Sequence, residues 1–210
     1  MKLDKTKIAV EIFNKLATLY QDKFMDVNLY GDTLNLFCNA IDKQHPEILE
    51  LACGPGNITK FLLEKRPDFK ILGTDLAPNM IALAKTNNPN AEFKIMDCRA
   101  IALIDKKYDA IMCGFCLPYL SKEETLKLIT DASKCLTQNG IFYISTMEED
   151  YNNSGFTKGS TGDEIFMHYY LEKDITSVLQ KNNFEILDLS RVDSSNQNTK
   201  DLIIIAKHHG

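Results

Sequence analysis

From residue 44 onward, short apolar runs alternate with helical patterns, and this alternation constrains the fold more than any other feature. Five runs have the length of strands, at 48–52, 70–76, 92–96, 108–113 and 141–147. Helices are expected between them at 57–65, from Pro78 onward, and from Ser121, with a capping box to Glu124, as far as Asn139-Gly140. Such alternation predicts a parallel sheet with helices on both faces and right-handed crossovers.

The two ends of the chain follow other patterns. Apolar residues at helical spacing predict two N-terminal amphipathic helices, one with Ile8, Ile12, Leu16 and Leu19, the other with Leu34, Phe37, Cys38 and Ile41. After a helix at 172–181, strands are expected at 184–192 and 201–207. The polar loop between them is too short for a helical crossover, so they should form an antiparallel hairpin.

The predicted fold class is therefore α/β, with a doubly wound sheet of seven strands, mostly parallel, and an antiparallel C-terminal hairpin. Residues 1–43 are expected to form an N-terminal helical cap, and 44–210 the main domain with an insert at 148–170. The formal net charge of −5 argues against a nucleic-acid binder. Without an apolar run of membrane-spanning length or a signal-peptide core, the expected location is cytoplasmic.

The segment from Ile48 to Thr59, ILELACGPGNIT, joins a buried strand to a helix through a glycine turn. Glycines allow close approach of a ligand, and ligands of doubly wound sheets bind at such strand ends. Thr59 stands where a dinucleotide fingerprint has its third glycine, and Glu50 suits a ligand with a cationic end. Asp75, 19 residues after Gly56, is placed to accept hydrogen bonds from ribose hydroxyls, or is a solvated strand-end acid.

With these segments, the chain resembles the class I S-adenosylmethionine-dependent methyltransferases, in particular their small-molecule branch. The matching motifs are the glycine segment, LGTDLAPNM at 72–80, FKIMDC at 93–98, YDAIMCGF at 108–115 and CLTQNGIF at 135–142. The resemblance extends from residue 44 to about 207 and implies a Rossmann-like fold.

The resemblance implies that S-adenosylmethionine is the cofactor and assigns a role to each matching residue. Gly54 and Gly56 would lie under its methionine part, with Glu50 ordering the turn and the amino end. Asp75 would hold the ribose and Leu76 would pack on the adenine. The remaining contacts would be Asp97 to the exocyclic amine, the Cys98 backbone N–H to a ring nitrogen, and the backbone of Cys113 and Gly114 to the methionine amino group.

In this family the acceptor contacts the N-terminal helices, the loop after the fourth strand and the insert after the fifth. The implied substrate residues are Phe115, Tyr119, Tyr151 and Tyr169. Tyr20 would cover the sulfonium or orient the substrate, unless it is an ordinary packing residue. His168 is the candidate general base, because imidazole titrates near neutral pH, with a structural histidine as the alternative. The insert at 148–170 is rich in Gly, Ser and Asn and is expected to be a mobile lid.

Six cysteines are scattered along the chain, and reduced thiols are expected. Cys113 and Cys116 form a C-x-x-C pair without a second pair nearby, so neither a metal site nor a thioredoxin-like role is expected. Cys53, Cys98 and Cys113 should lie at strand ends around the cofactor and make the site sensitive to oxidation.

The predicted function is methyl transfer from S-adenosylmethionine to a small organic acceptor by in-line displacement, with a base needed only if the acceptor arrives protonated. Two alternatives stay open: a non-catalytic sensor or accessory protein that binds S-adenosylmethionine, and a nicotinamide-dependent oxidoreductase. The expected partner is the small-molecule acceptor, with neither nucleic acid nor membrane. The acceptor's identity and the oligomeric state are not predicted.

Overall fold

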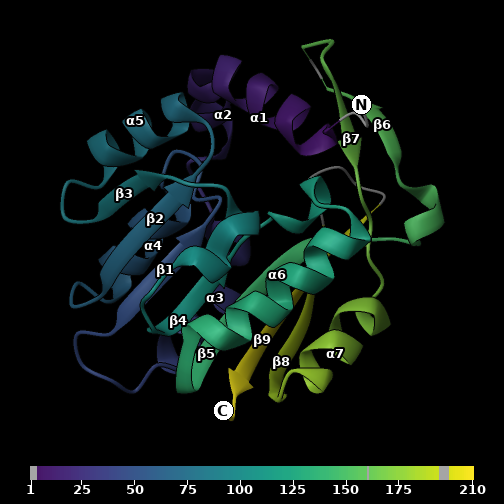
Figure 1. Cartoon of the computed structure of the whole chain (residues 1–210). Helices are drawn as coiled ribbons and strands as arrows, with labels where there is room; N and C mark the ends of the chain where they lie inside the picture. Colours follow the sequence, from purple (N-terminus) through teal and green to yellow (C-terminus); the bar gives the residue numbers. More distant parts are fainter. Residues whose placement is uncertain (1–3, 160, 194–198) are drawn as a thin grey trace.

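The computed structural model describes residues 4–159, 161–193 and 199–210, and its centre is a seven-stranded sheet in the order β3-β2-β1-β4-β5-β9-β8 (Figure 1). The strands are β1 (Glu47–Leu51), β2 (Lys70–Asp75), β3 (Glu92–Ile95), β4 (Tyr108–Cys113), β5 (Leu136–Glu148), β8 (Phe184–Asp193) and β9 (Lys200–His208). The pairs from β3 to β5 are parallel, whereas β9 is antiparallel to both β5 and β8. This topology confirms the predicted fold class.

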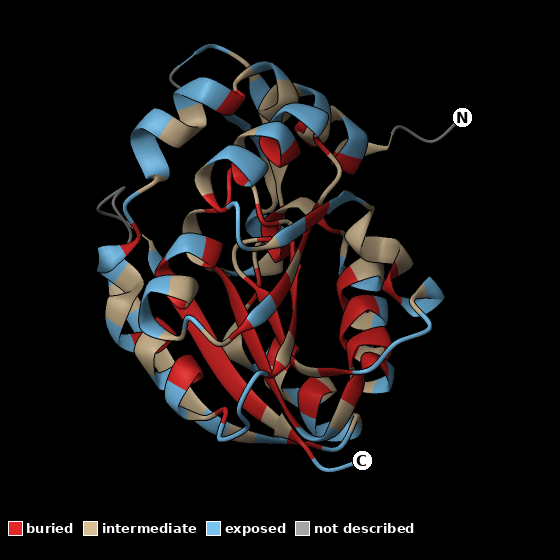
Figure 2. Cartoon of the chain, turned by 90° about the vertical axis from the view of Figure 1, so that its left-hand side faces the viewer, coloured by how far each residue is buried: buried red, intermediate tan, exposed pale blue. Residues whose placement is uncertain are grey.

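Helices cover both faces of the sheet, because successive strand residues point to opposite sides. Ile48 packs with α3 (Gly31–Asn39) and α4 (Asn57–Lys65), while Leu49 packs with residues of α6 (Lys122–Cys135), α7 (Glu172–Lys181) and the 3-10 helix η2 (Cys98–Leu103). Helix α5 (Pro78–Asn87) packs against β3 through Ile81 and Ala84. Figure 2 shows the result as a buried sheet between helices whose outer faces are exposed.

The N-terminal cap contains three helices rather than the predicted two: α1 (Lys5–Lys15), α2 (Ala17–Phe24) and α3, with the 3-10 turn η1 (Asn28–Tyr30) before α3. The predicted inward face is confirmed, since Leu34, Phe37 and Cys38 of α3 are buried, as is Ile41 just after the helix. The predicted face of the first helix is only partly buried: Ile8, Ile12 and Leu16 are half-buried and Leu19, in α2, is 50% exposed, whereas Ala9 is 2% exposed. The reason is that α1 lies over the carboxyl-end edge of the sheet, as Figure 1 shows, and presents a neighbouring stripe of residues to it.

The boundary between α6 and β5 differs from the predicted one. The helix ends at Cys135, and β5 starts at Leu136, which pairs with Tyr108. Asn139 then takes a left-handed backbone with φ 63°, and the register shifts before Ile141 pairs with Ala110. Asn-Gly therefore forms a bulge within a longer strand, because Asn tolerates this backbone conformation.

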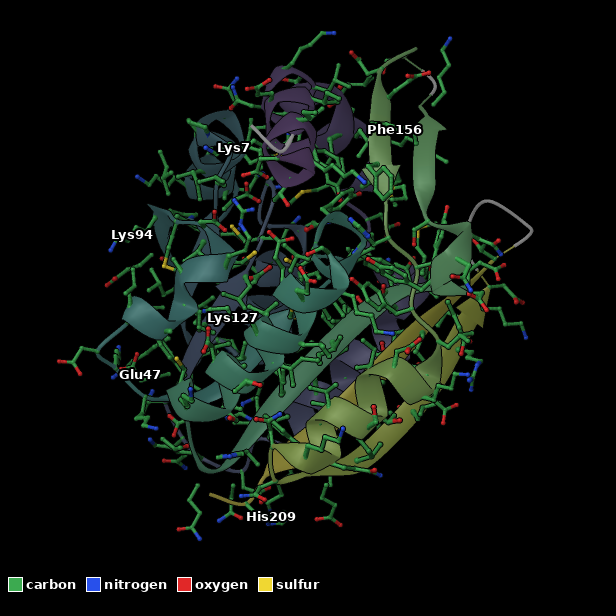
Figure 3. All side chains as sticks on the ribbon, turned by 45° about the vertical axis from the view of Figure 1, so that its right-hand side comes forward. Lys7, Glu47, Lys94, Lys127, Phe156 and His209 are labelled. Atoms are coloured by element: carbon green, nitrogen blue, oxygen red, sulfur yellow. The ribbon has the colours of Figure 1, made fainter. Side chains whose placement is uncertain are left out.

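The insert at 148–170 folds into secondary structure that was not predicted. It contains the 3-10 turn η4 (Tyr151–Asn153) and a hairpin of β6 (Gly155–Lys158) and β7 (Glu164–Met167). The hairpin lies against α1: Lys15 Nζ is 3.0 Å from a carboxylate oxygen of Asp163, and Lys5 Nζ lies 3.1 Å from the ring centroid of Phe166. Figure 3 shows Phe156 on this hairpin, where the residue is 55% exposed. Within the described residues, no helix combines the length and hydropathy needed to cross a bilayer.

Candidate functional site

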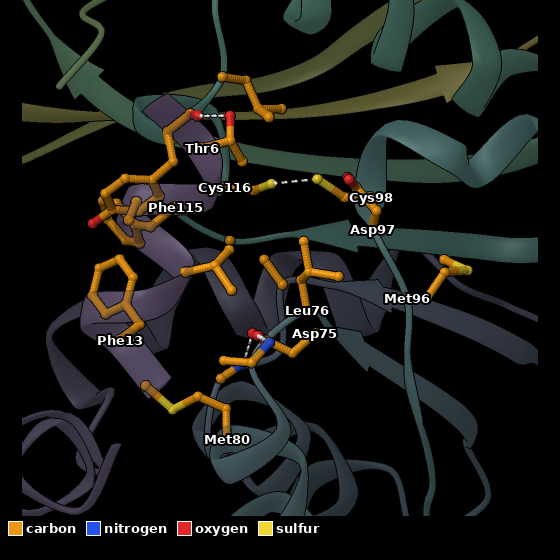
Figure 4. Close-up of a pocket in the computed structure, with 18 of the residues that line it drawn as sticks. Thr6, Phe13, Asp75, Leu76, Met80, Met96, Asp97, Cys98, Phe115 and Cys116 are labelled. Carbon is orange, nitrogen blue, oxygen red and sulfur yellow. Dashed lines mark hydrogen bonds between the residues drawn. The ribbon is translucent and has the colours of Figure 1, made fainter. Parts of the chain in front are cut away.

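A cavity opens where the carboxyl ends of β1, β2 and β4 meet under α1, and its empty volume including the mouth is about 790 Å³ (Figure 4). This volume is in the range of small-molecule sites. Its walls are mostly apolar and aromatic, and within residues 4–159, 161–193 and 199–210 the charged residues of the lining are Asp75 and Asp97. The lining residues are Thr6, Ala9, Val10, Phe13, Tyr20, Ala52, Gly54, Asp75, Leu76, Ala77, Met80, Met96, Asp97, Cys98, Gly114, Phe115, Cys116, Tyr119 and Leu120.

The glycine turn after β1 forms the floor of this cavity. Gly54 and Gly56 have φ values of 54° and 78°, which favour glycine. A Cβ at Gly56 would lie 2.4 Å from Nδ2 of Asn88, whereas one at Gly54 would lie 3.8 Å from its nearest neighbour, a ring carbon of Tyr20. The turn is thus tightly packed behind Gly56 and open toward the cavity at Gly54, where a ligand can approach the backbone.

Asp75, the last residue of β2, connects this turn to the start of α5. Its Oδ2 accepts a hydrogen bond from the Gly54 N–H at 2.9 Å, and its Oδ1 accepts one from the Ala77 N–H at 2.8 Å. Burial raises the pKa of Asp75, although these backbone hydrogen bonds oppose the rise. Since each carboxylate oxygen can accept a second hydrogen bond, Asp75 can still bind two donors from the cavity.

Glu50 lies behind the turn rather than in the cavity lining, and it is 1% exposed. The hydroxyl of Thr59 donates a hydrogen bond to its Oε2. Burial raises the pKa of Glu50 to about 7, although the bonds from Thr59 oppose the rise. Thr59, at the position of a third fingerprint glycine, therefore holds a buried carboxyl group.

Asp97 is held by Arg99, which links it to two further carboxylates. The guanidinium donates to Asp97 Oδ2 at 2.7 Å, to Glu124 Oε1 at 2.9 Å and to Asp4 Oδ1 at 3.2 Å. We call these four residues the Arg99 cluster. Burial alone would raise the pKa of Asp97, but the hydrogen bonds from Arg99 hold it below its ordinary value. Because Asp4 is the N-cap of α1, the cluster joins the cavity wall to the helix above it.

The end of β4 supplies the wall next to the glycine turn. Phe115 has a φ of 51° and its N–H donates to Ser145 Oγ at 2.9 Å. Ala52, after the neighbouring strand β1, has a φ of 53°. Two left-handed non-glycine residues on adjacent strand ends, both lining one cavity, are backbone strain of the kind that gathers at functional sites. A Cβ at Gly114 would lie 2.4 Å from Cδ1 of Ile58, so this position too is closely packed.

Helix α1 covers the cavity, with aromatic side chains beneath it. Phe13 packs edge-on against Tyr119, with ring centroids 5.0 Å apart, and against Tyr20 at 5.7 Å. The Thr6 hydroxyl donates to the Tyr119 carbonyl at 2.8 Å. Burial, followed by the charge of Asp75, raises the pKa of Tyr20 to about 12, so its hydroxyl stays protonated and can donate a hydrogen bond.

The structure brings most of the predicted site residues together. Nine line the cavity: Tyr20, Gly54, Asp75, Leu76, Asp97, Cys98, Gly114, Phe115 and Tyr119. Three lie just behind the cavity: Glu50, Gly56 and the fully buried Cys113. Cys53, which was also expected near the cofactor, is not part of the lining either. The other three, Tyr151, His168 and Tyr169, belong to the insert and are not in the lining either.

The contacts of His168 are those of a structural residue. It is 6% exposed, and its backbone N–H donates to the Pro118 carbonyl at 2.8 Å. The Nδ1 atom of its ring is 3.2 Å from the Tyr151 hydroxyl. Its ring centroid is 4.7 Å from that of Phe166. Burial lowers the pKa of His168, which keeps the imidazole neutral. The position of His168 therefore supports the structural alternative, and its role as a base stays a prediction.

Several lining residues were missed by the sequence reasoning. Thr6, Ala9, Val10 and Phe13 follow one another at spacings of three and four, which is a helical stripe that the larger Ile8 and Leu19 concealed. Met80 and Met96 lie in matched motifs and Cys116 in the C-x-x-C pair, but nothing in the sequence pointed to their side chains as part of the cavity wall. Among the described residues, no group of three or more His, Cys, Asp or Glu side chains is arranged to hold a metal ion.

Comparison with known proteins gives one family match. Residues 48–140 match the model of the family described as "Methyltransferase domain". The malonyl-[acyl-carrier protein] O-methyltransferase of Acetivibrio thermocellus is 39% identical over 112 residues, which are 52% of this chain and 39% of that protein. The trans-aconitate 2-methyltransferase of Variovorax paradoxus is 34% identical over 97 residues, 46% of this chain and 37% of that protein. The chain thus spans less than two fifths of the length of these curated relatives.

Solved structures share the whole fold at low sequence identity. The 1,6-didemethyltoxoflavin-N1-methyltransferase of Burkholderia thailandensis, crystallised with 1,6-didemethyltoxoflavin and S-adenosylhomocysteine, superposes with a TM-score of 0.75. That match covers 100% of this chain and 92% of the other, at 16% identity. At such identity the likeness establishes the fold alone.

Proposed function

We propose that this chain transfers a methyl group from S-adenosylmethionine to a small organic acceptor, and the match of residues 48–140 to the methyltransferase-domain model supports this proposal. The observation that carries the proposal is Asp75. Its carboxylate joins the floor of the glycine turn to α5 and keeps hydrogen-bonding capacity on the cavity side. A carboxylate in this place suits the paired hydroxyls of a ribose.

The rest of the cavity fits a nucleoside that ends in an amino acid. The backbone at Gly54 is open to close approach, and the side chains of Leu76 and Met96 offer apolar contact to a flat base. Asp97 accepts hydrogen bonds and lies in the same wall. Phosphate groups would meet two carboxylates and, among the residues that the structure describes, no basic side chain in the lining, which disfavours a dinucleotide.

The cofactor would supply a methyl group already activated on a positively charged sulfur. The protein then has to align the acceptor and exclude water, which preformed apolar walls do. The roof formed by Phe13, Tyr20 and Tyr119 provides such walls. The described part of the lining contains no histidine, lysine or arginine, so the acceptors that fit best are small, largely apolar molecules whose attacking atom needs no deprotonation by the protein.

Isothermal titration calorimetry with S-adenosylmethionine, S-adenosylhomocysteine and NAD tests the proposal. We expect both adenosyl compounds to bind, and Asp75→Ala to weaken them about 10- to 100-fold through loss of charge-assisted hydrogen bonds. Asp109→Ala is the matched control, because Asp109 contacts Lys43 and the Glu47 N–H, outside the cavity.

Each alternative has its own outcome in this experiment. Binding of NAD without binding of the adenosyl compounds would favour the oxidoreductase. If S-adenosylmethionine binds but its labelled methyl group is transferred to no component of a small-molecule extract, the sensor alternative gains support. Equal affinity of Asp75→Ala and the unchanged protein would contradict the role of Asp75.

A further inference from the structure

Two thiols from separate parts of the chain meet in the cavity wall. Cys98 is the first residue of η2, and Cys116 directly precedes the 3-10 turn η3 (Leu117–Tyr119). Their Sγ atoms are 3.4 Å apart, and Figure 4 shows them pointing toward each other in one wall of the cavity. Both thiols are free, and both residues line the cavity.

The geometry places these sulfurs close to bonding distance. A disulfide has an S–S length of about 2.05 Å, so the sulfurs need to approach by only about 1.4 Å. Each cysteine lies at the start of a single short 3-10 turn rather than inside a strand, so a small local shift can bring the sulfurs together. The contact joins residues 18 positions apart, and no other thiol of the chain is in this cavity lining.

We propose that Cys98 and Cys116 are a redox modification site, and that a peroxide converts them into a disulfide within the cavity wall. Cys98 reacts first, because it is half-buried whereas Cys116 is 3% exposed. The Cys98 thiol loses its proton, the thiolate attacks one peroxide oxygen and the O–O bond breaks, and the leaving hydroxide takes up that proton, which gives a sulfenic acid and one water. The Cys116 sulfur then attacks the Cys98 sulfur, and the S–O bond breaks with release of a second water. In total two thiols lose two electrons and two protons to the peroxide.

The environment of the two thiols sets the rate of their oxidation. A hydrogen bond between the two side chains, together with burial, raises the pKa of Cys98, so little thiolate is present at neutral pH and the reaction is slow. The oxidant must also enter through the cavity, since both thiols line it. A molecule that occupies the cavity should therefore protect both cysteines.

The disulfide would act on the part of the wall that holds Asp97. Cys98 lies between Asp97 and Arg99 in the chain, so a bond to Cys116 draws the start of η2 toward η3 and narrows the cavity between them. If the proposed function holds, the cavity narrows where the adenine would bind, and oxidation lowers the affinity for S-adenosylhomocysteine.

The experiment treats the full chain with hydrogen peroxide, quenches free thiols with an alkylating reagent, and maps cross-linked peptides by mass spectrometry. We expect one reversible cross-link between Cys98 and Cys116, lost in Cys98→Ser and Cys116→Ser. Cys38→Ser is the matched control, because Cys38 is buried in α3 away from the cavity, and it should keep the cross-link. No cross-link in the unchanged protein, or one between Cys113 and Cys116, overturns the proposal.

Addition of S-adenosylhomocysteine separates this site from the proposed function. Slower cross-linking with the ligand, and weaker ligand binding after oxidation, support both. If the cross-link forms but the ligand neither binds nor protects, the redox site stands and the proposed function fails. If the ligand binds and the thiols stay reduced under excess peroxide without it, the function stands and the redox site is refuted.

Discussion

The buried carboxyl group of Glu50 makes the stability of this protein depend on pH in a way that one substitution should remove. Burial raises its pKa from 4.5 to about 7 in the folded chain. At 1.36 kcal/mol per pKa unit, this rise corresponds to about 3 kcal/mol. The folded state binds the proton more tightly than the unfolded state does. The contribution to the free energy of unfolding is therefore fully present below pH 4.5 and is lost as the pH rises through 7.

Glu50→Gln places a neutral group of nearly the same shape in the same site. Its amide oxygen can still accept the hydrogen bond from Thr59. We expect the variant and the unchanged protein to have similar free energies of unfolding at pH 5. At pH 8 the variant should be more stable by about 2–3 kcal/mol, because it carries no charge that burial disfavours.

Urea unfolding followed by circular dichroism at pH 5, 6, 7 and 8 measures this difference. Glu64→Gln is the matched control, since Glu64 lies on the exposed side of α4, and its pH profile should follow that of the unchanged protein. If Glu50→Gln shows the same loss of stability between pH 5 and 8 as the unchanged protein, the assignment of that loss to Glu50 is refuted.

Three further substitutions test the packing around the site, all by urea unfolding. Gly56→Ala should destabilise the chain by about 2 kcal/mol or more, because it forces a side chain into a left-handed backbone and against α5; a loss below 0.5 kcal/mol would contradict this. Arg99→Gln should lower the free energy of unfolding by about 1–3 kcal/mol at pH 7 and by less at pH 3, since Arg99 stabilises the fold through Asp97 only while that carboxylate is ionised. Equal losses at both pH values would count against this explanation. Tyr30→Phe removes the donor that lies 2.7 Å from buried Asp201 and should cost about 1–3 kcal/mol at pH 8 but less at pH 4, where Asp201 takes up a proton; a pH-independent loss would exclude this explanation.

The sheet could be predicted because its signals are local. The run Ile48–Leu51, the glycine turn and Asp75 lie within 28 residues, and strand ends in a parallel sheet meet at one edge. The family motifs therefore named residues that do gather at one cavity. The helix boundary at Asn139 was harder, since Asn-Gly ends a helix or forms a bulge with equal ease and tertiary pairing decides between them.

The parts of the site that were missed depend on contacts between distant segments. The pattern of α1 contains two overlapping apolar stripes, and only its position over the cavity selects the one with Ala9 and Phe13. Arg99 was not expected to bind Asp97, because nothing in the sequence shows that Asp4 and Glu124 meet there too. His168 was chosen for its chemistry, and the fold packs it against Tyr151 and Phe166 within the insert instead.

The contacts that hold α1 over the cavity affect how fast molecules leave the cavity. Polar contacts near the surface connect the helix to its surroundings, among them Asp4 with Arg99 at 3.2 Å, Lys15 with Asp163 at 3.0 Å and Asn14 with the Asn79 N–H at 2.8 Å. Exposed ion pairs contribute little each and weaken with salt. Ions in solution therefore weaken the contacts that hold α1 over the cavity. We expect bound molecules to dissociate from the cavity faster as the ionic strength rises.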